Sequence, residues 1–343
     1  MGEKLSEVFE CYDIQITGSS KGRYAHIVET NQGAMQLRPM DVGEGRLRSE
    51  YTFKEKLFDQ GFEAIDRIVP NVDGELSTVD RYGNMHVMRR YFYGREMSVA
   101  NMTEVMMAVE NLADFHKAGT KVWQMLCEDM NSRHPVIRDD NDFTKRNKEL
   151  KRVRAYISRV SPKQRFEEVY MKVYNDFYLQ AVDCEGRMKR LLEQSKATPA
   201  ETASHLGYCH GSYNNHSILM CHDGRKNYIA TVGFDRFYVG NQLADLYYFA
   251  RKIVEKNGYD FNVLKEIIET YNSYIPLSRS DLEYIYLLFC YPEKFYKLSS
   301  QYINGAKVRI SPVMMEKISR IISSEEKKAK ILSEFRNIFL HIS

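Results

Sequence analysis

The residues whose side chains could best take part in a reaction lie between Tyr208 and Leu246. A polar loop, His210-Gly211-Ser212-Tyr213-Asn214-Asn215-His216-Ser217, is followed by Gly233-Phe234-Asp235 and then by Asp245. Oxygen atoms of carboxylates and amides are the ligands that Mg²⁺ prefers, and a carboxylate beside a substrate hydroxyl can act as a general base. The segment could support metal-assisted group transfer only if a carboxylate reaches the metal.

The order of these residues resembles the catalytic segment of aminoglycoside and choline kinases. Residues Tyr208 to Leu219 are similar to the His-Gly-Asp-(four residues)-Asn-Ile-Leu loop of that family. Residues Ala230 to Asp235 look like its Ile-Ile-Asp-Phe-Asp strand, and Asp245-Leu246 matches the Asp-Leu that opens its next helix. Three matches in order and at family spacing are more specific than any one of them, and they imply a protein-kinase-like fold.

The catalytic positions that the resemblance defines have all changed. Ser212 stands in place of the loop aspartate, Ser217 in place of the loop asparagine, and Gly233 in place of the metal-binding aspartate. A serine hydroxyl is no base near neutral pH, and glycine offers a metal no side chain. Loss of the general base alone lowers a rate by roughly 10²–10⁴-fold. We therefore expect no intact catalytic residue, no metal site and no phosphoryl transfer by the usual mechanism.

Asp235 is the residue that could restore activity. It lies two positions after Gly233, and residues two apart in a strand share a face, so a shift of register would bring its carboxylate to the metal. The spacing from Gly233 to Asp245 argues against the shift, because it already matches the family. The alternative function is an ATP-dependent small-molecule phosphotransferase with an altered metal site at Asp235, which would use ATP and magnesium.

Two residues are candidates for a vestigial nucleotide site. Arg38 stands where the family has a strand lysine, and its forked guanidinium differs from the point charge of lysine. Glu50 lies on a predicted helix, where it either pairs with Arg38 or is a solvated carboxylate on a helix face. These residues keep a third function open, that of a pseudokinase that binds nucleotide without transferring phosphate. Otherwise no cofactor is expected.

His210 and Asp245 are expected to have structural roles. By resemblance, His210 braces the loop, whereas Asp245 accepts hydrogen bonds from the loop backbone or caps a helix. The retention of Asp245 therefore supports the fold and not activity. The basic stretch from Lys145 to Arg154 is interpreted as a solvated helix face, with an acidic partner as the alternative.

The segment before residue 93 is predicted to be mostly β-strand, because short extended runs alternate with turn residues. Residues 1–92 should therefore form a small antiparallel lobe with one helix. The predicted elements are strands within Ile14 to Met40 with turns at Thr17 to Gly22 and Asn31 to Gly33, a helix from Arg46 to Gln60, and strands from Gly74 to Val79 and Met85 to Tyr91.

Residues 93–343 are predicted to form a larger, mainly helical lobe. An apolar stripe that begins near Val105 indicates a helix closed by Gly119, and further helical patterns continue to the C-terminus. The pattern lapses from Gly207 to Phe234, where a β-hairpin is expected beside the degenerate loop. The order of the elements predicts a two-lobed α+β fold, and the resemblance to the kinases implies that it is protein-kinase-like.

Composition restricts the class of protein. The 343 residues are 43% hydrophobic with 24 Tyr and 17 Phe, which supplies a packed core and argues against disorder. A formal net charge of +3 creates no strong field, so we expect neither nucleic acid nor membrane as a partner. Residues Met1 to Glu10 have no signal-peptide pattern, and no run reaches the about 18 apolar residues of a membrane span. We expect synthesis in the cytoplasm without export.

Further motifs resemble CotS-like spore coat proteins, a branch of the aminoglycoside phosphotransferase superfamily. The resemblance covers nearly the whole chain and implies a sporulation protein that is deposited in the spore coat, with other coat proteins as partners. The leading hypothesis is a pseudokinase that acts by protein–protein binding, and the sequence does not fix its oligomeric state. The motifs are Arg23-Tyr24, Glu29 to Gly33, Gly94-Arg95-Glu96, Leu112 to His116 and Tyr291 to Phe295.

Overall fold

The structure is a computed structural model of the chain, and it describes residues 5–22, 25–128, 136–139, 141–197, 205–305 and 312–341. Contacts divide the chain into two compact units of two segments each. Unit 1 comprises Met1–Ile137 and Gly207–Asp245, and unit 2 comprises Arg138–Leu206 and Leu246–Ser343. The candidate catalytic segment lies in unit 1. The sequence analysis places a lobe boundary between residues 92 and 93, on the basis of strand and helix content. The units are defined by contacts, so that boundary stays a prediction.

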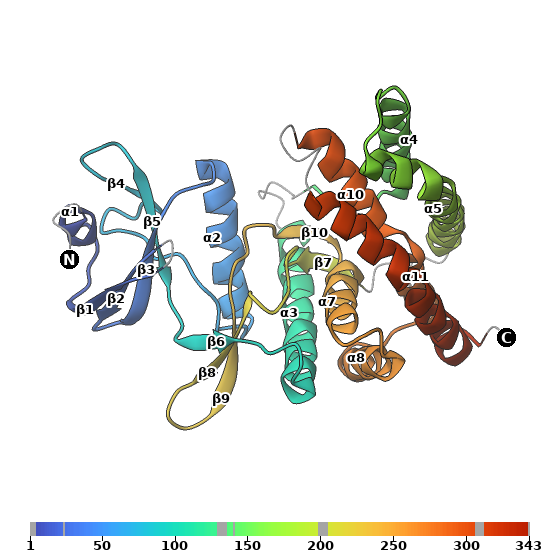
Figure 1. Cartoon of the computed structure of the whole chain (residues 1–343). Helices are drawn as coiled ribbons and strands as arrows, with labels where there is room; N and C mark the ends of the chain where they lie inside the picture. The colour runs from blue at the N-terminus through green and yellow to red at the C-terminus, as the bar shows by residue number, and fades with distance from the viewer. Residues whose placement is uncertain are drawn as a thin grey trace. The chain divides into compact units, whose positions relative to one another are not determined.

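Unit 1 begins with a five-stranded antiparallel sheet of order β1-β2-β3-β5-β4 (Figure 1). Its register pairs Val28 with Met35 and Leu37 with Met88. These side chains are buried together with Val8 of α1, a short helix that the sequence pattern does not predict. The elements are α1 Ser6–Glu10, β1 Ile16–Lys21, β2 His26–Thr30, β3 Gly33–Pro39, β4 Thr78–Val79 and β5 Met85–Arg90.

The first turn is not where the sequence predicts it. Residues Thr17 to Lys21 belong to β1 and pair with β2, with a shift of register between Ile16 and Gly18. The prediction of a turn at Thr17 to Gly22 is therefore wrong. Glycine and serine favour turns locally, but pairing with a neighbouring strand outweighs that weak preference.

Helix α2, Glu44–Asp59, has an apolar face that contains two charged residues. Phe53 on this face stacks on Tyr208 and Phe237, with ring centroids 4.1 Å and 5.0 Å away. Glu50 and Lys54 lie on the same face and are only 2% and 0% exposed. Charges so deeply buried require partners of opposite sign within the core.

Helix α3, Met102–Glu128, continues past Gly119, where the sequence predicts its end. A Cβ atom at Gly119 would lie 3.0 Å from the carbonyl oxygen of Tyr208 on β7, Leu206–Cys209. Glycine is needed here because the strand approaches the helix closely, and not because the helix stops. The predicted end of the helix is therefore wrong.

The remaining strands of unit 1 position the candidate loop. Strands β6, β8 and β9 form a three-stranded sheet of that order, and β7 pairs with β10. The β8–β9 hairpin expected from the sequence is present. The loop with His210 connects β7 to β8, and the Gly233 segment connects β9 to β10. The bounds are β6 Gly94–Glu96, β8 Ile218–His222, β9 Asn227–Thr231 and β10 Tyr238–Asn241.

Unit 2 is helical, and aromatic side chains fill its interior. Phe295 stacks on Tyr170 and Phe177, with centroids 4.9 Å and 4.5 Å away. Among the described residues, no helix has the length and apolarity to cross a membrane. The helices are α4 Phe143–Ser158, α5 Arg165–Ala197, α7 Leu243–Lys256, which begins in unit 1, α8 Phe261–Tyr274, α9 Arg279–Cys290, α10 Glu293–Asn304 and α11 Pro312–Phe339.

The close approach at Gly119 can be tested by substitution. We expect Gly119→Leu to lower the free energy of unfolding by roughly 1–3 kcal/mol, because the new side chain must displace the β7 backbone. Gly45→Leu is the control, since a Cβ at Gly45 on α2 would meet nothing within 4 Å. Urea denaturation of both variants checks this, and equal stabilities would contradict the packing described.

Candidate functional site

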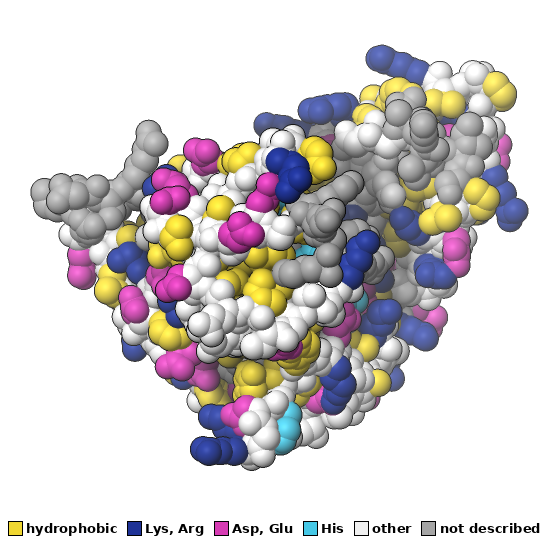
Figure 2. Space-filling view, turned by 90° about the vertical axis from the view of Figure 1, so that its left-hand side faces the viewer, with side chains coloured by type: hydrophobic (Ala, Val, Ile, Leu, Met, Phe, Trp, Pro, Cys, Tyr) yellow, Lys and Arg dark blue, Asp and Glu magenta, His cyan; other side chains and the backbone are white. Residues whose placement is uncertain are grey.

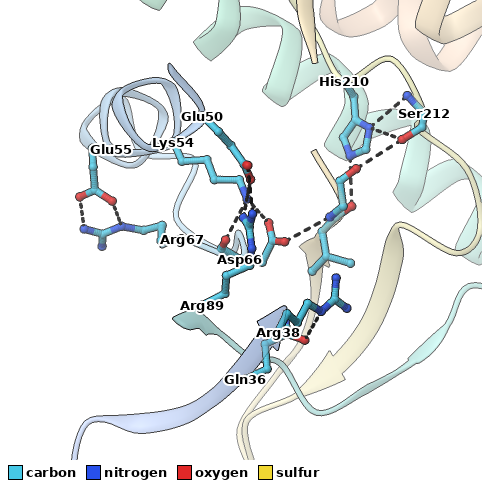
Figure 3. A network of polar contacts seen from close by, with 12 residues as sticks. Gln36, Arg38, Glu50, Lys54, Glu55, Asp66, Arg67, Arg89, His210 and Ser212 are labelled. Carbon is cyan, nitrogen blue, oxygen red and sulfur yellow. Dashed lines mark hydrogen bonds and ion pairs between the residues drawn. The ribbon is translucent and has the colours of Figure 1, made fainter. Parts of the chain in front are cut away.

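Four charged side chains of unit 1 form a buried cluster, which we call the charge quartet: Glu50, Lys54, Asp66 and Arg89 (Figure 3). The Lys54 Nζ atom lies 2.6 Å from Glu50 Oε1 and 2.7 Å from Asp66 Oδ1. Arg89 on β5 binds the Glu50 carboxylate with both terminal nitrogens, with Nη2 3.0 Å from Oε2. None of the four is more than 7% exposed, and their charges cancel.

The contacts within the quartet favour the ionised forms of Glu50 and Arg89. Burial alone would raise the pKa of Glu50, but the charges of Lys54 and Arg89 outweigh it and lower that pKa to about 2. Burial likewise opposes the charge of Arg89, whereas hydrogen bonding to Glu50 raises its pKa above the usual value. A buried ion pair adds little net stability, but removal of one partner is strongly destabilising. Removal of any one of the four charged side chains should therefore destabilise the whole quartet.

Asp66 connects the quartet to the Gly233 segment. Its Oδ2 atom accepts a hydrogen bond from the Gly233 backbone N–H at 3.3 Å, while Oδ1 holds Lys54. Gly233 has a φ of +79°, a conformation that favours glycine. The position that the kinase resemblance assigns to a metal-binding carboxylate thus has no side chain, and its backbone is bound to Asp66.

His210 and Asp245 brace the candidate loop. The Asp245 carboxylate accepts hydrogen bonds from the N–H groups of His210 and Gly211, at 2.6 Å and 3.0 Å, as one of the two expected roles requires. The buried His210 ring has Nε2 3.2 Å from the Val232 carbonyl and Nδ1 3.3 Å from the Ser212 N–H. Because a carbonyl only accepts and an N–H only donates, Nε2 carries the proton. Burial lowers the pKa of His210, so the ring is neutral.

The two serine hydroxyls are bound within the loop region. Ser217 Oγ accepts from the Asn214 N–H at 3.0 Å and donates to the Asn214 carbonyl at 2.9 Å. Ser212 Oγ donates to the Gly233 carbonyl at 3.3 Å. Among the residues that the structure describes, no three or more His, Cys, Asp or Glu side chains are grouped to hold a metal. The residues at this site therefore do not fit a magnesium ion held between carboxylates.

Asp235 is exposed and lines a cavity of about 60 Å³ together with Arg38 and Arg89. The charge of Arg38 beside this carboxylate opposes the approach of a cation, whereas Arg89 is already paired with Glu50. The backbone of the segment is also fixed, because Arg46 of α2 donates to the carbonyls of Asp235 and Phe237 at 3.1 Å and 2.7 Å. The proposed rescue by Asp235 stays a prediction.

The structure does not pair Glu50 with Arg38. Arg38 is exposed on β3, and its Nε atom donates to Gln36 Oε1 at 3.0 Å (Figure 3). Glu50 is neither solvated nor bound to Arg38, so both interpretations of its surroundings are wrong. Their place in a nucleotide site stays a prediction.

Sequence reasoning missed three residues of this region: Lys54, Asp66 and Arg89. One signal could have found Lys54, because it lies on the apolar stripe of α2 four residues after Glu50, the spacing of a helical ion pair. No local pattern marks Asp66 or Arg89. They reach Lys54 and Glu50 only when the chain folds.

The lowered pKa of Glu50 predicts a pH-dependent stability. Because the folded pKa is about 2 against 4.5, the ionised carboxylate stabilises the fold above about pH 4.5, and this contribution is lost as the pH falls toward 2. Its size is on the order of 3 kcal/mol. In urea denaturation from pH 6 to pH 2, wild type should lose its advantage over Glu50→Gln. Parallel pH profiles would contradict the quartet.

Solved structures with this fold share little sequence with the chain. An aminoglycoside phosphotransferase from Alicyclobacillus acidocaldarius matches with a TM-score of 0.75 and 14% identity, over 97% of this chain and 95% of that one. A spectinomycin phosphotransferase in complex with ADP and spectinomycin gives 0.63 and 11%, over 98% of both chains. A choline kinase from Cryptosporidium parvum gives 0.54 and 12%, over 97% and 93%. These matches confirm the predicted two-lobed, α+β kinase-like fold.

A comparison with protein families identifies the chain more narrowly than the shared fold does. No curated protein matches the sequence. Residues 5–335 match the family described as "Spore coat putative kinase YutH". This match confirms the resemblance to spore coat proteins. The chain therefore belongs to the spore coat putative kinase YutH family.

Proposed function

We propose that this protein is a catalytically degenerate kinase-fold protein of the spore coat that acts by binding other coat proteins. The observation that carries the proposal is the hydrogen bond from the Gly233 backbone to Asp66. At the position of the family's metal-binding aspartate there is no side chain, and the carboxylate bound there neutralises Lys54. Phosphoryl transfer depends on charge neutralisation by metal ions, which this arrangement does not supply.

The neighbouring loop supports the same proposal. Ser212 cannot serve as a general base near neutral pH, and its hydroxyl donates to the Gly233 carbonyl. The Ser217 hydroxyl binds the backbone of Asn214 within the loop. Both side chains therefore hold the loop together, which is a structural use of positions that serve chemistry in an active kinase.

Family membership supports a place in the spore coat. In this proposal the chain is made in the cytoplasm, is deposited in the coat, and has other coat proteins as its partners. The fold then supplies a rigid surface, because Arg46, Phe53 and the quartet fix α2 to the rest of unit 1.

The absence of phosphoryl transfer can be tested directly. We expect no magnesium-dependent ATP turnover above background from the purified full-length chain with hydroxyl or amine substrates, and no difference between wild type and Asp235→Ala. Coupled detection of ADP measures this. Turnover that disappears in Asp235→Ala would instead establish the alternative, a small-molecule phosphotransferase with an altered metal site.

Nucleotide binding without turnover needs a separate measurement. A ligand at 100 times its Kd that binds only the folded state adds about 2.7 kcal/mol of stability, so it raises Tm. We expect no change in Tm with millimolar ATP, with or without magnesium, because the residues at the metal position do not fit magnesium. A rise in Tm that is absent in Arg38→Ala would favour the nucleotide-binding pseudokinase.

A further inference from the structure

The exposed face of α4 carries a row of positive charges. Lys145, Lys148 and Arg152 are exposed on α4, and Arg159 is exposed at its C-cap. Their spacing of three, four and seven residues places the four along one side. At a rise of 1.5 Å per residue, the row is roughly 21 Å long. We call these four residues the basic row.

No acidic side chain in the described part of the chain neutralises the basic row. Within the described ranges, none of its four members forms an ion pair. The two acidic residues nearest in sequence are engaged elsewhere, because Asp142 caps α4 and Glu149 accepts a hydrogen bond from Tyr296 at 2.9 Å. The four charges are therefore available to a partner.

A second set of cations lies on the neighbouring side of α4. Lys151 is 5.6 Å from the ring centre of Tyr178, and Arg154 is 5.2 Å from that of Tyr174, both on α5. These contacts hold both cations on the α5 side of the helix. The surface thus has positive charge across two sides of one helix.

The two units carry net charges of opposite sign, although the net charge of the whole chain is small. Unit 2 has 30 Lys and Arg against 22 Asp and Glu, an excess of +8, whereas unit 1 has 19 against 24, an excess of −5. On the N-terminal side that faces the viewer in Figure 2, acidic, basic and apolar side chains are interspersed. Positive charge is therefore concentrated in unit 2.

We propose that the basic row binds an extended acidic segment of another coat protein, an inference that rests on the proposed function and names the chemistry of its partner. At about 3.3 Å per extended residue, a segment of six or seven residues matches the row. Carboxylates on that segment complement the four cations. A short acidic segment matches the length of the row, and binding of a nucleic acid in its place is an outcome of the test below.

The test uses a fluorescein-labelled octaglutamate peptide and fluorescence anisotropy with the full-length chain at low ionic strength. Lys148→Glu/Arg152→Glu should bind the peptide at least ten-fold more weakly than wild type. The matched control is Lys327→Glu/Lys330→Glu, on exposed positions of α11 in the same unit, which changes the net charge equally and should bind like wild type. Both double variants replace two cations by two anions, so a difference between them reports where the charges lie and not how many there are.

Two further measurements separate a specific site from general attraction and from misfolding. Lys148→Arg/Arg152→Lys keeps the charges and should keep the affinity, and raising the salt to about 0.15 M should weaken wild-type binding because exposed charges are screened. Equal losses in the α4 and α11 variants, or no peptide binding by wild type, would overturn the proposal. So would tighter, α4-dependent binding of octathymidylate, which would assign the row to nucleic acid.

Failure of the acidic partner and failure of the proposed function give different results in these experiments. If the chain turns over ATP with magnesium and still binds the peptide, the proposal of a degenerate kinase is rejected. The proposal that the basic row binds an acidic segment then still stands. If the chain neither turns over ATP nor binds the peptide, only the proposal of an acidic partner is rejected.

Discussion

The ion pair between Lys54 and Asp66 is the interaction on which the arrangement of unit 1 depends. A lysine that is 0% exposed must have a partner, because an unpaired charge in the core is strongly destabilising. Its partners come from different segments, so one cation fixes α2, the chain that follows it and, through Glu50, strand β5. The requirement for neutrality also commits Asp66 to a structural use.

The interactions that stabilise this kinase-like fold differ from those that would perform chemistry. Asp245 holds the backbone of the loop, and the aromatic contacts of Phe53 hold α2 against Tyr208 and Phe237. None of these contacts needs a residue at the positions of Ser212 or Gly233 to be acidic. The fold can therefore persist while those positions change, which agrees with TM-scores up to 0.75 at 14% identity.

The sequence predicts what depends on local order along the chain. The hairpin of β8 and β9, helix α2 and the loop hydrogen bonds to Asp245 follow from periodicity and from a motif of fixed spacing. Helix α3 extends past Gly119, because the close approach of β7, which no local pattern reveals, is what requires glycine there. The quartet was missed because Asp66 and Arg89 gain their partners only through tertiary folding.

The positive φ of Gly233 makes an aspartate at this position unfavourable. Space for a Cβ atom exists there, since nothing lies within 4 Å, but the backbone at +79° is strained for any residue with a side chain. An aspartate would also add a fifth charge beside a neutral quartet and next to Asp66. Gly233→Asp would thus combine an unfavourable backbone conformation with repulsion from Asp66, so the local structure itself disfavours a carboxylate at this position.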